Sequence, residues 1–182
     1  MHRYLTHVTG RLRSYLPTQK RRDAHFVRQL CDGDGDAWGQ LLDHWSPHLY
    51  SYISYNVVTE ADVRRLMRLI LSDLIQTLIG EQPIEHLTVV IFRIAYRHLL
   101  RYRRQAPDPF SHPLWQRKQA AATGETLPNY FFQHLQQFSP EVQQLLLLRY
   151  LCGVTLPELA QIVGQPEELL TRLLSRTRFY PS

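Results

Sequence analysis

The sequence has few cysteines and no long apolar run, and each shortage excludes a class of protein. Cys31 and Cys152 are its only cysteines and have no CxxC spacing, which excludes a disulfide framework and predicts free thiols in a reducing compartment. The longest unbroken apolar runs are tetrads such as residues 145–148, whereas a membrane span needs about 20 apolar residues. The N-terminus lacks the apolar core of a secretory signal. These absences predict a cytoplasmic protein that does not associate with a membrane.

Motifs for catalysis and metal binding are also missing. The sequence contains no Gly-rich phosphate loop, no nucleophile elbow and no HExxH motif, so we expect neither an enzyme nor a cofactor or small-molecule substrate. The acidic stretch 32–36 imitates the start of a calcium loop, but Ala37 stands where that loop needs glycine, and a helix cap is the better interpretation. His44 and His48 have no evident third ligand, which predicts a solvated pair rather than a metal site.

The basic residues are almost all arginine, and they are clustered. The 182 residues carry a net charge of +5, and 19 of the 21 basic residues are Arg. Residues 1–28 hold seven basic residues against one acid, and residues 92–104 hold five Arg and no acid. The planar guanidinium fork suits phosphate oxygens and guanine edges, so this clustering favours a nucleic-acid partner. From charge alone, a solvated surface with ordinary ion pairs is an equally good interpretation.

Apolar periodicity predicts an all-α fold. The expected helices cover residues 22–31, 37–53, 60–79, 83–104, 127–138, 140–151, 156–163 and 166–180. Pro47 is expected to kink the second helix or divide it in two. The Pro-rich stretch between the fourth and fifth helices is typical of a linker. The predicted organisation is therefore two small helical domains, with a basic arm at 1–21, a four-helix domain at 22–104, a linker at 105–127 and a helix-turn-helix domain at 128–182.

The last third of the chain has a helix-turn-helix pattern. Thr155 and Glu158 have the spacing of a capping box, and the turn is expected at Gly164 to Pro166. Such a unit commonly places its second helix in the major groove of DNA. The predicted DNA contacts of this unit are Thr155, Glu167, Glu168, Thr171, Arg172, Ser175, Arg176 and Arg178. The alternative is a packing motif within an ordinary helical domain.

Residues 146–178 resemble the fourth conserved region of the extracytoplasmic-function (ECF) sigma factors of bacterial RNA polymerase. The matching segments are Leu-Arg-Tyr at 148–150, Gly-Val-Thr at 153–155, Glu-Leu-Ala at 158–160, Ile-Val-Gly at 162–164 and Pro-Glu at 166–167. Residues 22–104 resemble the second conserved region of the same family, through Gly-Asp-Ala-Trp at 35–38, Asp62 before an apolar helix, Arg-Ile-Ala at 93–95 and Arg-Arg at 103–104. The order and spacing of both halves agree with the family, and the resemblance covers most of the chain.

The resemblance implies a non-enzymatic transcription initiation factor with double-stranded promoter DNA, core RNA polymerase and an inhibitory anti-sigma protein as partners. The third helix would bind the polymerase, the fourth would read the minus-ten promoter element, and the helix-turn-helix would read the minus-thirty-five element. The implied polymerase-binding residues are Asp62, Arg64, Arg65, Leu66, Arg68 and Leu69. The implied DNA-binding residues of the fourth helix are Arg93, Tyr96, Arg97, Arg101, Tyr102, Arg103 and Arg104, which combine cations with rings for unstacked bases.

The third helix departs from the family pattern. Where the family usually has acidic and amide residues after Asp62, this chain has Arg64, Arg65 and Arg68, so the charge on the implied polymerase-binding face is reversed. An alternative function is therefore a diverged sigma-like module that binds DNA or an acidic protein partner and no longer binds core polymerase.

Overall fold

Every element of secondary structure in the described part of the chain is an α-helix, which confirms the predicted fold class. The computed structural model describes residues 18–80, 86–106 and 129–177. Its helices are α2 (Thr18–Cys31), α3 (Gly35–Asn56), α4 (Glu60–Ile79), α5 (Leu87–Arg103), α7 (Asn129–Leu135), α8 (Pro140–Tyr150), α9 (Leu156–Val163) and α10 (Glu167–Arg176). Among these, no helix combines the length and the apolar character needed to cross a bilayer. Residues 1–17 of the predicted arm, most of the predicted linker and Arg178 lie outside the described residues, whereas residues 18–21 of that arm form the start of α2.

Side-chain caps begin the helices where the sequence predicts them. Asp34 precedes α3, and its Oδ1 accepts hydrogen bonds from the backbone N–H groups of Asp36 (2.9 Å) and Ala37 (3.2 Å). This confirms that the acidic stretch contains a helix cap. At α9 the predicted capping box is complete, because the hydroxyl of Thr155 accepts from the N–H of Glu158 while the Glu158 carboxylate accepts from the N–H of Thr155.

Pro47 does not divide α3, so the division, one of the two expected outcomes, is wrong. The helix runs without interruption through the proline, from Gly35 to Asn56. An interior proline costs about 3 kcal/mol, because it removes one backbone donor and crowds the preceding turn. Trp45 and Leu49 flank it and are both buried, and burial of side chains of this size contributes roughly 1.5–3 kcal/mol each. The hydrophobic burial outweighs the local penalty.

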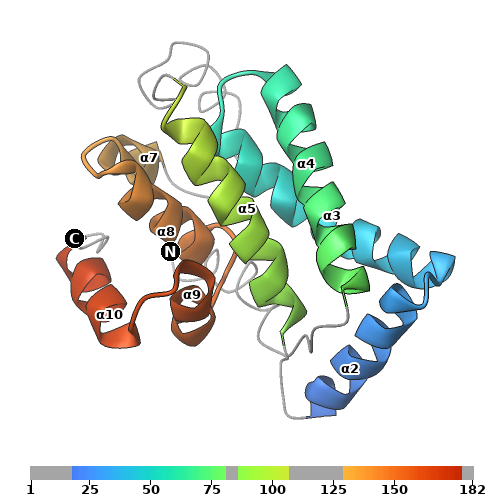
Figure 1. The fold of residues 1–182 in the computed structure, drawn as a ribbon. Helices are drawn as coiled ribbons and strands as arrows, with labels where there is room; N and C mark the ends of the chain where they lie inside the picture. Colours follow the sequence, from blue (N-terminus) through green and yellow to red (C-terminus); the bar gives the residue numbers. More distant parts are fainter. Residues whose placement is uncertain (1–17, 81–85, 107–128, 178–182) are drawn as a thin grey trace.

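Helix α5 lies at the centre of the fold. Figure 1 shows it between α3 and α4 on one side and α8 and α9 on the other. Its buried residues include Phe92 and Leu99. The ring of Phe92 meets those of Trp45 and Tyr52 edge to face, with centroids 5.8 and 5.9 Å apart. The hydrophobic core runs continuously from the N-terminal helices through α5 into α8 and α9, so the two halves pack directly against each other.

Two hydrogen bonds attach α2 to the rest of the N-terminal half. The indole Nε1 of Trp38 donates to the carbonyl of Leu30 (3.0 Å), and the thiol of Cys31 donates to the carbonyl of Leu78 (2.7 Å). Both cysteines are free thiols, Cys31 exposed and Cys152 buried. The burial of Cys152 raises the pKa of its thiol, which disfavours the reactive thiolate.

The predicted helix-turn-helix is present in α9 and α10. Gly164 ends α9 with a φ of 68°, in the left-handed region that glycine adopts without strain. Leu159 and Leu170 are buried in the hydrophobic core, and α9 packs against both α10 and α8. Tyr150, in the last turn of α8, is 41% exposed, and its ring meets that of Phe131 edge to face.

Replacing the cap of α9 tests this local account. We expect Thr155→Ala to lower the free energy of unfolding by about 1 kcal/mol, because it removes the acceptor for an otherwise unpaired N–H. Urea denaturation followed by circular dichroism measures this change. Thr171→Ala is the matched control: its exposed hydroxyl bonds only to the carbonyl of Glu167 within α10, and its effect should stay within about 0.5 kcal/mol. Equal effects of the two substitutions on the free energy of unfolding would contradict the assignment of Thr155 as the cap of α9.

Candidate nucleic-acid interface

The outward face of α10 carries the residues predicted to contact DNA. Leu170 is the buried residue of this helix, whereas the predicted contacts Glu167, Glu168, Thr171, Arg172, Ser175 and Arg176 are all exposed. The hydroxyls of Thr171 and Ser175 donate to carbonyls of their own helix. Within residues 18–80, 86–106 and 129–177, no ion pair involves Arg172 or Arg176. Two guanidinium groups are therefore available to a ligand along this helix.

An apolar groove adjoins these arginines and was not predicted. It lies between the start of α8 and α10 and is lined by Phe138, Val142, Leu169, Arg172, Leu173, Arg176 and Thr177. Leu169 is half exposed at its edge, although it belongs to a helix with a strong apolar stripe. The sequence signal is the pair of adjacent leucines at 169 and 170, of which only one fits the buried stripe.

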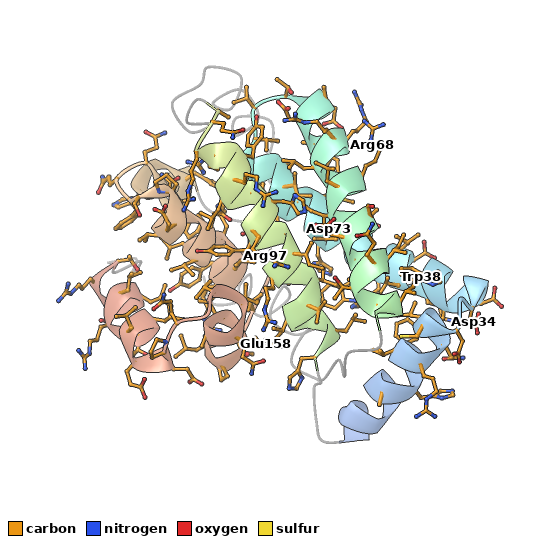
Figure 2. All side chains as sticks on the ribbon, in the orientation of Figure 1. Asp34, Trp38, Arg68, Asp73, Arg97 and Glu158 are labelled. Carbon is orange, nitrogen blue, oxygen red and sulfur yellow. The ribbon has the colours of Figure 1, made fainter. Side chains whose placement is uncertain are left out.

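The arginines predicted to contact DNA from α5 divide into two groups. Arg97, Arg101 and Arg104 are exposed. Arg97 and Arg101 line a small surface hollow together with His98 of α5 and Asp73 of α4. The Nε2 atom of His98 lies 2.7 Å from Oδ2 of Asp73. In Figure 2, Arg97 extends from α5 on the side that faces Asp73. Two guanidinium groups beside one carboxylate give this hollow an excess of positive charge, which suits a phosphate oxygen.

The second group, Arg93 and Arg103, contacts the protein itself. Arg93 donates from Nε (3.2 Å) and Nη2 (3.0 Å) to the backbone carbonyl of Gln161 in α9. Arg103 is only 7% exposed, and it donates to the side-chain oxygens of Gln143 in α8 (2.7 Å) and Asn56 in α3 (3.4 Å). Arg103 is buried, so its guanidinium is not presented to a nucleic acid in this arrangement, whereas Arg93 stays exposed with its guanidinium bonded to α9.

Tyr102 and Asp62 were predicted to contact different partners, but they contact each other. The Tyr102 hydroxyl donates to Oδ2 of Asp62 (3.0 Å), and the guanidinium of Arg65 lies 5.9 Å from the centre of the Tyr102 ring. Burial and the Asp62 hydrogen bond raise the pKa of Tyr102 to about 12, so its hydroxyl remains a neutral donor at physiological pH. The other predicted ring, Tyr96, is half-buried against the core. The hydrogen bond between Tyr102 and Asp62 connects the end of α5 to the start of α4.

The outward face of α4 presents most of the residues predicted to bind polymerase. Arg64, Arg65, Arg68 and Leu69 are exposed, and Figure 2 shows Arg68 extending away from the bundle. Leu66 is 3% exposed, so it belongs to the core rather than to this surface. The sequence analysis missed that the exposed face continues to Ile75 and Ile79, which are 41% and 59% exposed. Their spacing places them outside the buried stripe Leu66, Ile70, Leu74 and Leu78.

The two histidines with the spacing of metal ligands, His44 and His48, contact the ring of Trp45. The ring centroids of His44 and His48 are 5.9 Å apart, and both rings meet Trp45 edge to face. Burial, with the nearby His44, lowers the pKa of His48 and favours its neutral form. In the part of the chain that the structure describes, no cluster of three or more His, Cys, Asp or Glu side chains is arranged to hold a metal ion.

The fold combines a helical bundle, α2 to α5, with a helix-turn-helix unit that packs on it, an arrangement similar to that of ECF sigma factors. The solved structure titled as CnrH in complex with the cytosolic domain of CnrY contains a chain with this fold, at a TM-score of 0.68. The two chains are 18% identical, and the match covers 86% of this chain and 92% of the other. No protein-family model matches the sequence, and no curated protein matches it.

Replacing Asp62 tests its structural role. We expect Asp62→Ala to lower the free energy of unfolding by about 1–2 kcal/mol, because the hydroxyl of Tyr102 loses a charged acceptor and α4 loses part of its first turn. Thermal and urea denaturation measure the loss. Arg64→Ala, a change on the exposed side of the same turn, should stay within about 0.5 kcal/mol. If Asp62→Ala has the same free energy of unfolding as the unmodified protein, Asp62 does not stabilise the contact between α4 and α5.

Proposed function

We propose that this chain is a sigma factor-like transcription initiation factor that binds double-stranded promoter DNA and core RNA polymerase. The observation that carries the proposal is the fold: a helical bundle and a helix-turn-helix unit in the order of ECF sigma factors, with the second helix of that unit exposed. The excess of arginine over acidic residues is consistent with a nucleic-acid partner.

The proposed DNA contacts combine base recognition with phosphate binding. Helix α10 would lie in the major groove, where Arg172 and Arg176 can reach base edges or the flanking phosphates. Arg97 and Arg101 would hold the backbone at a second place, from the hollow beside Asp73. Base contacts supply the specificity and phosphate contacts supply affinity that falls with salt.

The outward face of α4 is the proposed surface for protein partners. It has exposed cations at Arg64, Arg65 and Arg68 and exposed apolar side chains at Leu69 and Ile75. A mixed surface of this kind suits a partner that is both acidic and apolar, which fits polymerase and also fits the alternative of a sigma-like module with a different acidic partner. The complex of CnrH with the cytosolic domain of CnrY supports a further proposal, that an inhibitory protein binds this chain.

The specificity of α10 is tested by Arg172→Ala. Sequences that the full-length protein prefers are first selected from a random duplex pool, and binding to the selected and scrambled duplexes is then titrated by fluorescence anisotropy. We expect Arg172→Ala to reduce the preference for the selected duplex by roughly tenfold, since a base contact contributes about 1–3 kcal/mol. Arg28→Ala, an exposed arginine of α2, is the control and should leave the preference intact. No sequence preference in the unmodified protein would overturn the proposal.

The phosphate contacts of α5 are tested by the salt dependence of DNA binding. The double variant Arg97→Ala/Arg101→Ala should reduce the slope of log affinity against log salt concentration by about one or two units. The double variant Arg64→Ala/Arg68→Ala makes the same change of charge on α4 and should leave the slope unaltered. Equal slopes for all three proteins would place Arg97 and Arg101 away from phosphate.

A further inference from the structure

Helix α4 carries more large exposed apolar side chains than any other helix in the described part of the chain. Seven such side chains are exposed among the described residues, and three of them belong to α4: Leu69 at 45%, Ile75 at 41% and Ile79 at 59%. Helices α2, α3 and α5 pack against the other sides of α4. The outward face is therefore left without a partner, and exposed apolar side chains gathered on one face mark a protein contact.

The exposed residues of this face follow the spacing of a helix that packs against another helix. Positions 61, 65, 68, 72, 75 and 79 are all exposed, and they are separated alternately by four and three residues. Residues with this heptad spacing form one line along a helix. The line is about 27 Å long, at a rise of 1.5 Å per residue. The partner that fits it is a second helix lying along α4.

The first half of this line is basic. Arg64, Arg65 and Arg68 are exposed there. Arg64 and Arg65 pair with the carboxylates of Glu60 and Asp62 in their own helix, and exposed pairs of this kind are weak. Within residues 18–80, 86–106 and 129–177, Arg68 forms no ion pair. The partner should therefore bring carboxylates to this end of α4.

An acidic corner, made of Asp32, Asp34 and Asp36, adjoins the other end of α4. Asp34 caps α3, whereas Asp32 and Asp36 are exposed and form no ion pair with any described residue. The corner lies beside the last turn of α4, because the thiol of the preceding Cys31 donates to the carbonyl of Leu78. One molecule thus carries both the cations and the carboxylates that the contact requires, at opposite ends of one apolar face.

A second copy of this chain matches the face when the two α4 helices run antiparallel. Figure 2 shows Arg68 extending from the upper part of α4 and Asp34 lower in the view, where α2 meets α3. A two-fold axis then places the basic end of each copy against the acidic corner of the other. With the axis at Ser72, whose side chain is small, Leu69 of one copy lies level with Ile75 of the other.

We propose that this chain forms a two-fold symmetric dimer through the outward face of α4, with Ser72 of both copies at its centre. The contact consists of one helix face and the adjoining corner, which is less than a permanent dimer buries, so association is reversible. The dimer does not depend on the function proposed above, but its consequence does. It covers the α4 surface proposed for polymerase or another acidic partner, so self-association and partner binding exclude each other.

Sedimentation equilibrium of the full-length chain, without DNA or polymerase, tests the dimer. We expect monomers and dimers to interconvert between about 1 and about 200 μM protein. Ile75→Ala/Ile79→Ala should weaken dimerisation about tenfold or more, because each copy loses apolar contact area. Leu169→Ala is the matched control, since this leucine of α10 is also half exposed. A chain that stays monomeric throughout the range overturns the proposal, as does a dimer that both variants weaken equally.

Charge reversal tests the antiparallel orientation. Arg64→Glu/Arg68→Glu makes both ends of the face acidic, and Asp32→Lys/Asp36→Lys makes both ends basic, so each variant alone should stay monomeric where the unmodified chain dimerises. An equal mixture should form a heterodimer, because every acidic end then meets a basic end. Circular dichroism establishes that each variant folds, and if one does not, the apolar variant and the cross-link below decide. A mixture of folded variants that stays monomeric contradicts the arrangement.

A cross-link tests the position of the two-fold axis. In a Cys31→Ser background, where the remaining Cys152 is buried, Ser72→Cys brings two thiols together at the axis, and mild oxidation should join the copies by a disulfide. Gln76→Cys is the control: it is equally exposed, but its two copies are separated by about 12 Å along the helices and should not join. Equal cross-linking of both variants contradicts an axis at Ser72.

The exclusion of other partners has its own measurement. The cross-linked Ser72→Cys dimer should not retain core RNA polymerase in a pull-down, and reduction of the disulfide should restore binding by the same chain. A cross-linked dimer that still binds polymerase contradicts the exclusion. If neither form binds polymerase, the proposed function fails, while sedimentation and cross-linking still report on the dimer.

Discussion

The fold depends on α5 being buried from two sides. One flank packs against α3 and α4 through residues such as Phe92, and the other packs against α8 and α9. A helix in this position supplies apolar area to both halves at once, which neither half can replace by itself. It also determines which of its charges remain outside. Arg97 and Arg101 reach solvent, whereas Arg103 ends within the protein.

Local features of the fold were predictable because their causes are local. Caps such as Asp34 and Thr155 satisfy N–H groups within three residues, and Gly164 supplies a backbone conformation that other residues rarely adopt. The bounds of α4 follow from its apolar period and match the prediction from end to end. The continuity of α3 through Pro47 did not follow, because burial of Trp45 and Leu49 by distant helices decides it.

The candidate site was predictable only in part. The exposed residues of α10 follow from the helical period once Leu170 is assigned to the core. The placement of Arg103 and Leu66 depends on which helix covers them, and no pattern within α5 or α4 contains that information. One sequence signal was present but unused: Gln143 and Gln144 directly precede four leucines, and all six side chains are buried in α8.

The arginines of the candidate nucleic-acid interface include exposed groups on α10, two groups beside a carboxylate in the hollow at Asp73, and two groups, Arg93 and Arg103, that donate to C-terminal helices. The most direct test of the proposed role is transcription in vitro from a linear template that carries the selected duplex, with core RNA polymerase and the full-length chain. The account predicts discrete run-off transcripts that require both the chain and the selected sequence. The account is contradicted if a folded chain that binds the duplex neither associates with core polymerase nor supports any template-specific transcript.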